Sequence, residues 1–297
     1  MLIWSTVREV LLCPGCRLPF ARNEDRLICS RCGVAVARDP DDGFFDLRSH
    51  AATQRGLLAS ETTDSGFTNR TFLQFSKSRF IHTLREMVAQ APPACVLDVG
   101  CGGGEYALAL EGLCEEYYGL EPSDIPAGRR LRCVPPPDVT LIHHDPERPW
   151  PIADQSADLV SFIASYDHLP DRQVALEETW RVLRPGGRLL IGMSSSRFWL
   201  KRALVRIGLE TIVPRHEDEH ACTHSPESLI KEVTSYRSSA VVDGVKADFL
   251  HLPNLPKRFS ALYASRTLLA VGQAVLGGTI RRIAPQAGSQ MIVTFVK

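Results

Sequence analysis

The sequence predicts an α/β protein, with a doubly wound sheet of seven strands preceded by a small cysteine-rich module. Three observations carry this prediction. Short apolar runs alternate with helical patterns from residue 71 onward, which is typical of a parallel sheet with helices on its faces. One of these runs leads through a glycine-rich turn into a helix. Four cysteines near the start of the chain form two C-x2-C pairs.

Length and composition limit the classes of function. The 297 residues are sufficient for one large domain and one small one, and 44% of them are hydrophobic. The formal net charge of +0 provides no overall field that would attract nucleic acid or a membrane. The opening MLIWSTVREVLLC has neither the basic leader nor the cleavage site of a secretory signal, and the apolar tract TLLAVGQAVLGGTI is too short to span a bilayer. We therefore expect a cytoplasmic protein with no membrane span.

The two cysteine pairs predict a zinc ribbon over residues 1–48. Cys13 and Cys16 enclose Pro-Gly, and Cys29 and Cys32 enclose Ser-Arg. Two such tight turns can supply the four thiolates of a tetrahedral zinc site, and the intervening RLPFARNEDRLI has the pattern of strand, polar turn and strand. A redox dithiol is the alternative. Because four protein ligands leave no open coordination position, the predicted zinc is structural.

The rest of the chain is predicted to be a linker followed by the large domain. Residues 49–70 lack periodicity and are rich in Ser, Thr and Gly, which indicates a linker or flap. Residues 71–297 are predicted to begin with a helix over 71–90. The predicted strands are CVLDVG, EYYGLE, VTLIHHD, ADLVSFIAS, RLLIGM, SSAVVDGVKADFL and MIVTFVK. In such sheets, ligands bind beyond the carboxyl ends of the strands.

The stretch VLDVGCGGGEYALAL, from Val96 to Leu110, indicates the kind of ligand. It has no Gly-Lys-Ser/Thr, which excludes a nucleoside triphosphate loop, and an acid at Asp98 would repel a pyrophosphate. A carboxylate there suits a ligand with a positive amine. Glu121, at the end of the second strand, can accept from both hydroxyls of a ribose, and Asp145 can accept from an exocyclic amino group. These features together predict an adenosyl sulfonium ligand.

Four segments that follow one another along the chain resemble the class I S-adenosylmethionine-dependent methyltransferases. They are VLDVGCGGGEYALAL, GLEPS, HHDPERPWPIADQSADLV and EETWRVLRPGGRLLIGM. The resemblance covers residues 71–297 and implies a Rossmann-like methyltransferase sheet. It places Asp98 and the glycine loop around the methionine part of the cofactor, Glu121 on the ribose and Asp145 near the adenine. The cofactor-binding residues it implies are Asp98, Gly100, Cys101, Gly102, Gly104, Glu121, Pro122, Asp145, Pro146 and Ser165.

The acceptor side is less clearly marked in the sequence. The resemblance implies that SYDHLPD, after the fourth strand, lines the boundary between cofactor and acceptor. His168 is a candidate general base there, with packing or a hydrogen bond as the alternative role. Tyr166 is a second catalytic candidate, which would touch the cofactor or the acceptor. Further on, His216, His220 and His224 lie among acids. Their spacing allows a second metal site or a solvated loop before a helix. The resemblance implies that this region helps to build the acceptor pocket, which makes His220 and His224 acceptor-side candidates.

Three functions are open at this point. The first is a methyltransferase that transfers a methyl group to a small-molecule acceptor, such as a secondary metabolite, by in-line displacement. The second is a ribosomal RNA base methyltransferase, because a family of these also has an N-terminal zinc ribbon. The ribbon here has five arginines against two acids between Cys13 and Arg38, and RNA binding would fall steeply with salt. The third is a non-catalytic zinc-ribbon adaptor, against which the intact set Asp98, Glu121 and Asp145 argues.

Overall fold

The computed structural model describes the N-terminal module and the core of the large domain. The described residues are 10–23, 25–49, 78–124, 138–146, 148–169, 171–196, 224–249, 288 and 290–297, together with Thr267, Val271, Val275, Gly278 and Arg282. The linker predicted over residues 49–70 therefore lies outside the description except at Ser49, and so does His220.

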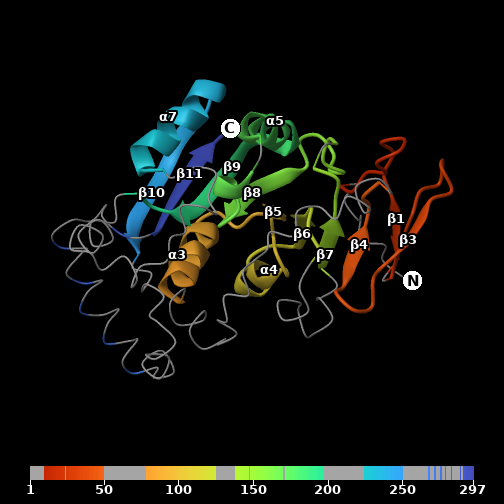
Figure 1. The fold of residues 1–297 in the computed structure, drawn as a ribbon, viewed down its shortest axis with the longest axis horizontal. Helices are drawn as coiled ribbons and strands as arrows, with labels where there is room; N and C mark the ends of the chain where they lie inside the picture. The colour runs from red at the N-terminus through yellow and green to blue at the C-terminus, as the bar shows by residue number, and fades with distance from the viewer. Residues whose placement is uncertain are drawn as a thin grey trace, which may run out of the picture.

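After residue 78 the predicted strands follow in order, with α4 between β5 and β6, α5 between β8 and β9, and α7 between β9 and β10 (Figure 1). The strands are β1 (Ala21–Asn23), β2 (Arg26–Ile28), β3 (Ala35–Ala37), β4 (Phe44–Asp46), β5 (Cys95–Val99), β6 (Glu116–Glu121), β7 (Val139–His143), β8 (Ala157–Ile163), β9 (Leu183–Ser194), β10 (Val241–Phe249) and β11 (Gln290–Val296). The helices are α3 (Ser78–Ala89), α4 (Glu105–Ala109), the 3-10 turn η1 (Tyr166–His168), α5 (Arg172–Val182) and α7 (Pro226–Tyr236).

Over the described residues, the large sheet has eight strands in the order β10-β11-β9-β8-β5-β6-β7-β4. Its strands are parallel except β11, which runs antiparallel to both of its neighbours. All seven predicted strands are present, as β5 to β11. The prediction of seven strands in the sheet was nevertheless wrong by one, because the N-terminal segment adds β4 beside β7.

The additional strand β4 is too short to stand out in the sequence. It has three residues, FFD, directly after a polar turn, and it lies in the stretch assigned to the zinc ribbon. Its pairing with β7 aligns Phe44 with Leu141 and Asp46 with His143. Phe44 and Phe45 are both buried, and they enter the hydrophobic clusters on opposite faces of the sheet, as alternation along a strand requires.

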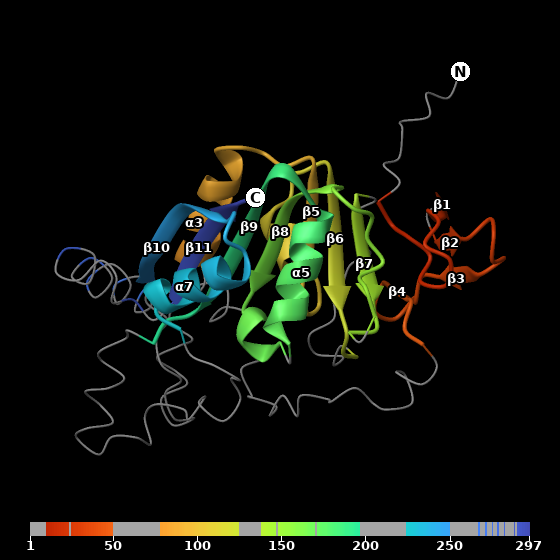
Figure 2. The same ribbon diagram turned by 90° about the horizontal axis from the view of Figure 1, so that it is seen from above.

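Helices cover both faces of the sheet. Figure 2 shows α5 and α7 in front of the strands and α3 behind them. Leu176 of α5 and Leu229 of α7 belong to one buried cluster, and Leu84 of α3 and Leu110, just after α4, belong to the other. Because both faces are buried, the central strands read as continuous apolar runs in the sequence. This arrangement leaves the carboxyl ends of the strands as the place for a ligand.

The N-terminal module forms its own three-stranded antiparallel sheet, β1-β2-β3, which packs on the large domain beside β4 (Figures 1 and 2). The strand, turn and strand predicted between the cysteine pairs correspond to β1 and β2. Leu11 bridges to Ile152, and Arg17 donates to the carbonyl of Trp150 at 2.7 Å. Cys13 and Cys29 share a buried cluster with Trp150. The domain limits 1–48 and 71–297 stay predictions.

The apolar tract TLLAVGQAVLGGTI lies largely outside the description. Among the helices that the structure does describe, none is long and apolar enough to cross a membrane.

Candidate functional site

The predicted cofactor residues gather at one edge of the sheet. Strands β5, β6, β7 and β8 are parallel neighbours, so their carboxyl ends meet at the same edge. The glycine loop follows β5, Glu121 ends β6, Asp145 follows β7 and Ser165 follows β8. The structure therefore brings together, from four separate strands, the residues that the sequence assigned to one ligand.

The glycine loop has a backbone that only glycine adopts easily. Gly100, Gly102 and Gly104 have φ angles of 71°, 55° and 81°, which lie in the left-handed region that favours glycine. The amides of Gly100 and Cys101 both donate to the carbonyl of Leu120, at 2.8 and 3.1 Å. Among the described residues, no atom would lie within 4 Å of a Cβ atom added at Gly102. The loop is thus tied to β6 on one side and has open space on the other.

Ser165, just after β8, packs against the glycine loop. A Cβ atom at Gly100 would lie 2.4 Å from the Cβ of Ser165, and the Ser165 hydroxyl donates to the carbonyl of Val99 at 2.5 Å. On the opposite side, Cys101 is buried against β6, where a Cβ atom at Gly119 would lie 2.7 Å from the Cys101 sulfur. The glycines at positions 100 and 119 are required by these close approaches.

The carboxylate of Glu121 is held beside the loop by backbone amides. Gly102 donates to its Oε2 at 2.9 Å and Ser123 donates to its Oε1 at 3.0 Å. Burial raises the pKa of Glu121, and the two amide hydrogen bonds act in the opposite direction. Pro122 follows directly and is half-buried. Since each carboxylate oxygen has a second lone pair, both oxygens can still accept from a diol.

Asp98 lies deeper in the sheet than the other acids. Its side chain is 1% exposed and accepts from the hydroxyl of Tyr117 at 2.5 Å and from that of Ser161 at 2.7 Å. Burial raises the pKa of Asp98 to about 6, against the effect of these two hydrogen bonds. Neither Tyr117 nor Ser161 was expected at this site from the sequence. The strand register, which pairs Asp98 with Ser161, identifies the latter only once the sheet order is known.

At the end of β7, Asp145 is buried and is contacted by the N-terminal segment. The hydroxyl of Ser49 donates to its Oδ2 at 2.8 Å, and the Nε of Arg148 lies 3.7 Å from the same oxygen. Pro146 follows and is half-buried. Ser49 was not expected at this site, because it lies 96 positions earlier in the sequence.

Two of the residues predicted for the acceptor side, Tyr166 and His224, lie together around an unexpected acid, Glu232 of α7. Tyr166 is fully buried and donates to Glu232 at 3.1 Å, and the Nε2 of His224 lies 3.2 Å from the other carboxylate oxygen. Arg172 donates to Glu232 at 2.7 Å. The side chain of His168 is 46% exposed and lies 4.0 Å from Asp167. Tyr166 is thus engaged within the protein, whereas His168 is accessible to solvent.

The comparison with known proteins agrees with this arrangement. Residues 97–191 match the methyltransferase domain family. That range runs from β5 through most of β9 and contains the four strand ends that form the site.

Two relatives illustrate the extent of the similarity. The chain is 30% identical over 124 residues to the 27-O-demethylrifamycin SV methyltransferase of Amycolatopsis mediterranei (strain S699), which covers 40% of this chain and 46% of that protein. It is also 30% identical over 167 residues to Methyltransferase GfsG of Streptomyces halstedii, covering 55% of this chain and 56% of that protein. The chain thus spans about half the length of these relatives.

A solved S-adenosylmethionine dependent methyltransferase from Mesorhizobium loti is 16% identical with a TM-score of 0.46, over 75% of this chain and 98% of that one.

The four predicted metal ligands form a compact cluster in the N-terminal module. The sulfurs of Cys13, Cys16, Cys29 and Cys32 all lie within 4.8 Å of one another. A tetrahedral zinc with bonds of about 2.3 Å would separate its sulfurs by about 3.8 Å, so the cluster fits such an ion. Backbone amides approach the thiols, as that of Cys32 does towards the Cys29 sulfur at 3.4 Å.

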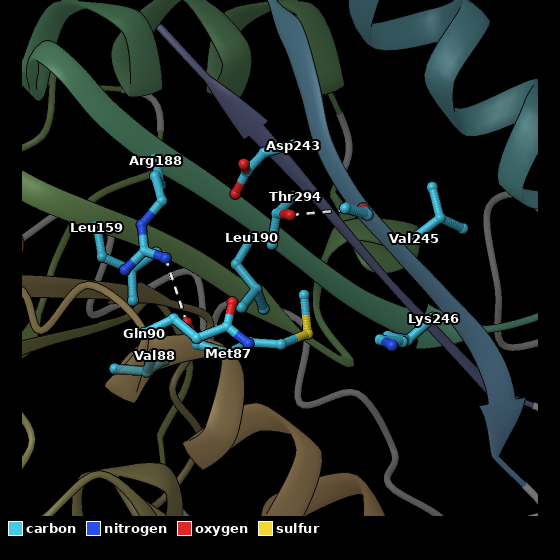
Figure 3. Close-up of a pocket in the computed structure, with 11 residues that line it drawn as sticks. Met87, Val88, Gln90, Leu159, Arg188, Leu190, Asp243, Val245, Lys246 and Thr294 are labelled. Carbon is cyan, nitrogen blue, oxygen red and sulfur yellow. Dashed lines mark hydrogen bonds between the residues drawn. The ribbon is translucent and has the colours of Figure 1, made fainter.

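A cavity of about 320 Å³ lies elsewhere, between α3 and strands β8 to β11 (Figure 3). Leu159, near the amino end of β8, and Arg188, its partner in β9, line it together with Asp243, near the amino end of β10. The guanidinium of Arg188 donates to the carbonyl of Met87 at the end of α3, at 3.2 Å. The cavity is therefore away from the carboxyl edge, and none of the described residues that line it is a predicted site residue.

Proposed function

We propose that this chain is an S-adenosylmethionine-dependent methyltransferase that acts on a small-molecule acceptor. The observation that carries the proposal is the carboxylate of Glu121, held by the amides of Gly102 and Ser123 beside an open glycine loop at the edge of a parallel sheet. The match of residues 97–191 to the methyltransferase domain family supports it. The small-molecule class rests on the names of the relatives, which include a methyltransferase of a demethylrifamycin.

Each group at the carboxyl edge has a distinct role in this proposal. Glu121 accepts from the ribose hydroxyls, Asp145 faces the adenine end, and the Gly100–Gly104 backbone lies along the methionine part with Asp98 behind it. S-adenosylmethionine, when bound, supplies an electrophilic methyl group on its sulfonium sulfur. The protein contributes positioning, since aligning the acceptor with that methyl group lowers the barrier by several kcal/mol.

The residues on the acceptor side divide into two kinds. His168 is half-exposed at η1, where it can exchange a proton with an acceptor and with solvent. Tyr166 is buried and donates to Glu232, so it holds the η1 turn against α7. His224 contacts the same carboxylate and packs near the ring of Tyr166, at a centroid distance of 6.4 Å. We propose His168 as the base for an acceptor that must lose a proton, with Tyr166 and His224 shaping the wall beside it.

The cysteine cluster is proposed to hold a structural zinc ion. The fit of four sulfurs within 4.8 Å supports this, and four thiolate ligands leave no position for a substrate. A cytoplasmic location stays a prediction from the sequence.

Isothermal titration calorimetry with S-adenosylhomocysteine tests the proposed function. We expect a dissociation constant in the micromolar range or below, and transfer of labelled methyl groups to low-molecular-weight acceptors. Titration with ribosomal RNA at several salt concentrations is the second arm. If the protein bound RNA with a steep salt dependence and methylated it in preference to small molecules, the acceptor class would be wrong. Failure to bind the nucleoside at all would refute the methyltransferase assignment.

Replacing Glu121 with alanine is expected to weaken S-adenosylhomocysteine binding by about 1–3 kcal/mol, because the ribose hydroxyls lose a charged acceptor. The matched control is Glu116→Ala, at the amino end of the same strand β6. Calorimetry on both variants and on Glu121→Gln separates the loss of charge from the loss of the contacts with Gly102 and Ser123. Equal affinity in Glu121→Ala and wild type would remove Glu121 from the site.

Cofactor affinity is expected to fall below pH 6. Burial raises the pKa of Asp98 to about 6, so the carboxyl is protonated in acid, and a cationic amine beside it favours the ionised form. Binding must then expel a proton, which weakens affinity by up to about tenfold per pH unit below that pKa. The stability of the ligand-free protein depends on pH in the opposite direction. The contribution of Asp98 to the free energy of unfolding is greatest in acid and is lost as pH rises through about 6. Calorimetry in two buffers of different ionisation enthalpy measures the proton release, and Asp98→Asn should abolish it.

A further inference from the structure

The N-terminal segment reaches the site that the sequence assigned wholly to residues 71–297. Because β4 is parallel to β7, its carboxyl end lies at the same edge of the sheet as the glycine loop. The pairing continues one residue further, where the amide of Leu47 donates to the carbonyl of His143 at 2.8 Å. Ser49, two residues later, is thereby level with the residues that follow β7.

The side chain of Ser49 contacts the proposed adenine-binding acid. Its hydroxyl donates to Oδ2 of Asp145 at 2.8 Å, and Asp145 is only 6% exposed. Arg148 approaches the same oxygen at 3.7 Å. To accept a hydrogen bond from one amino group, a carboxylate must be held in one orientation. A hydrogen bond to one of its oxygens holds it in that orientation.

Arg48 fixes the position of Ser49. Its side chain is 6% exposed and pairs with both oxygens of Asp46, at 2.9 and 2.7 Å. It also donates to Asp124 at 2.9 Å and to the carbonyl of Pro122 at 3.4 Å. The segment after β4 is thus attached to the residues that follow both β6 and β7, which are the ribose and adenine sides of the proposed site.

We propose that Ser49 is a positioning residue of the cofactor site, which orients the Asp145 carboxylate to accept from the exocyclic amino group of adenine. The inference rests on the proposed function. The inference adds a reason for base specificity to that function. A carboxylate held in this way accepts a hydrogen bond from a 6-amino purine and repels the carbonyl oxygen of a 6-oxo purine. The recognition of the base then depends on the N-terminal segment.

The test compares two ligands, S-adenosylhomocysteine and S-inosylhomocysteine, by calorimetry on the full chain. Wild type is expected to prefer the adenosyl compound. Ser49→Ala is expected to weaken adenosyl binding about tenfold, the effect of one hydrogen bond to a charged group, with a much smaller change for the inosyl compound. Ser49→Thr keeps the hydroxyl and should restore the preference. Ser156→Ala removes a hydroxyl that donates to the carbonyl of Ala153 just before the amino end of β8, and it should change neither dissociation constant.

Three outcomes would overturn the inference. Ser49→Ala could bind both ligands as wild type does, which would show that the contact is not used. It could weaken both ligands equally, which would indicate a structural effect rather than recognition of the base. Ser49→Thr could behave as Ser49→Ala does, so that the hydroxyl would not be the cause. If wild type bound neither ligand, the proposed function would fall as well, and the two failures are therefore distinguishable.

Discussion

Replacing Cys29 with serine is expected to release the proposed zinc and to unfold the N-terminal module. Cys29 is fully buried and shares a cluster with Leu27 and Trp150. A structural zinc contributes roughly 10 kcal/mol or more to the folding of small modules, which is comparable to the net stability of a whole domain. Three-residue strands such as β1, β2 and β3 have too little buried surface to replace that contribution.

The effect should extend to the cofactor site. Ser49 and Arg48 reach Asp145 and Asp124 only while β4 lies on β7, so we expect weaker S-adenosylhomocysteine binding in Cys29→Ser. Metal analysis, hydrogen exchange over residues 10–49 and calorimetry measure the three effects. The matched control is Cys114→Ser, because Cys114 is a half-buried cysteine outside the cluster. Zinc retention with unchanged exchange protection in Cys29→Ser would contradict the prediction.

Gly100→Ala is expected to destabilise the protein by about 2–5 kcal/mol and to abolish cofactor binding. Its φ of 71° is strained for any residue with a Cβ atom, at about 1–2 kcal/mol. The new atom would also lie 2.4 Å from the Cβ of Ser165, and overpacking of this kind adds about 1–3 kcal/mol. Relief of the overlap must move the loop, and with it the amide of Gly102 that holds Glu121.

Gly112 provides the control for backbone strain alone. It has a φ of 75°, but a Cβ atom there would lie within 4 Å of no atom in the part of the chain that the structure describes. Gly112→Ala should therefore cost only about 1–2 kcal/mol and leave cofactor affinity unchanged. Urea unfolding gives both free energies, and a double variant with Ser165→Gly should recover part of the loss in Gly100→Ala. Equal effects of the two alanine substitutions would show that the contact with Ser165 is not limiting.

The sequence was sufficient for those parts of the fold that depend on local pattern. Apolar runs identified the strands β5 to β11, and the spacing of four cysteines identified a cluster that the structure assembles. The carboxyl-edge location of Asp98, Glu121 and Asp145 followed from a general property of parallel sheets. Their roles towards a cofactor stay predictions.

What the sequence could not supply are contacts between distant segments. Nothing near Phe44–Asp46 indicates that this strand pairs with β7, since the partner lies almost a hundred positions away. The same holds for Ser49 on Asp145 and for Tyr166 on Glu232, whose hydrogen bonds span 96 and 66 positions. In each case the sequence around the residue has no distinctive motif. Only the order of the strands and helices in the fold determines which residue its side chain contacts.

The position of β4 also has a consequence for aggregation. A bare strand edge offers unpaired amides and carbonyls to other chains. Here the outer side of β7 is occupied by β4, and β4 is in turn bridged to the small sheet through Arg38 and Phe45. A fragment that began after β4 would present the backbone of β7 to its neighbours, so we expect it to self-associate through that strand more readily than the full chain.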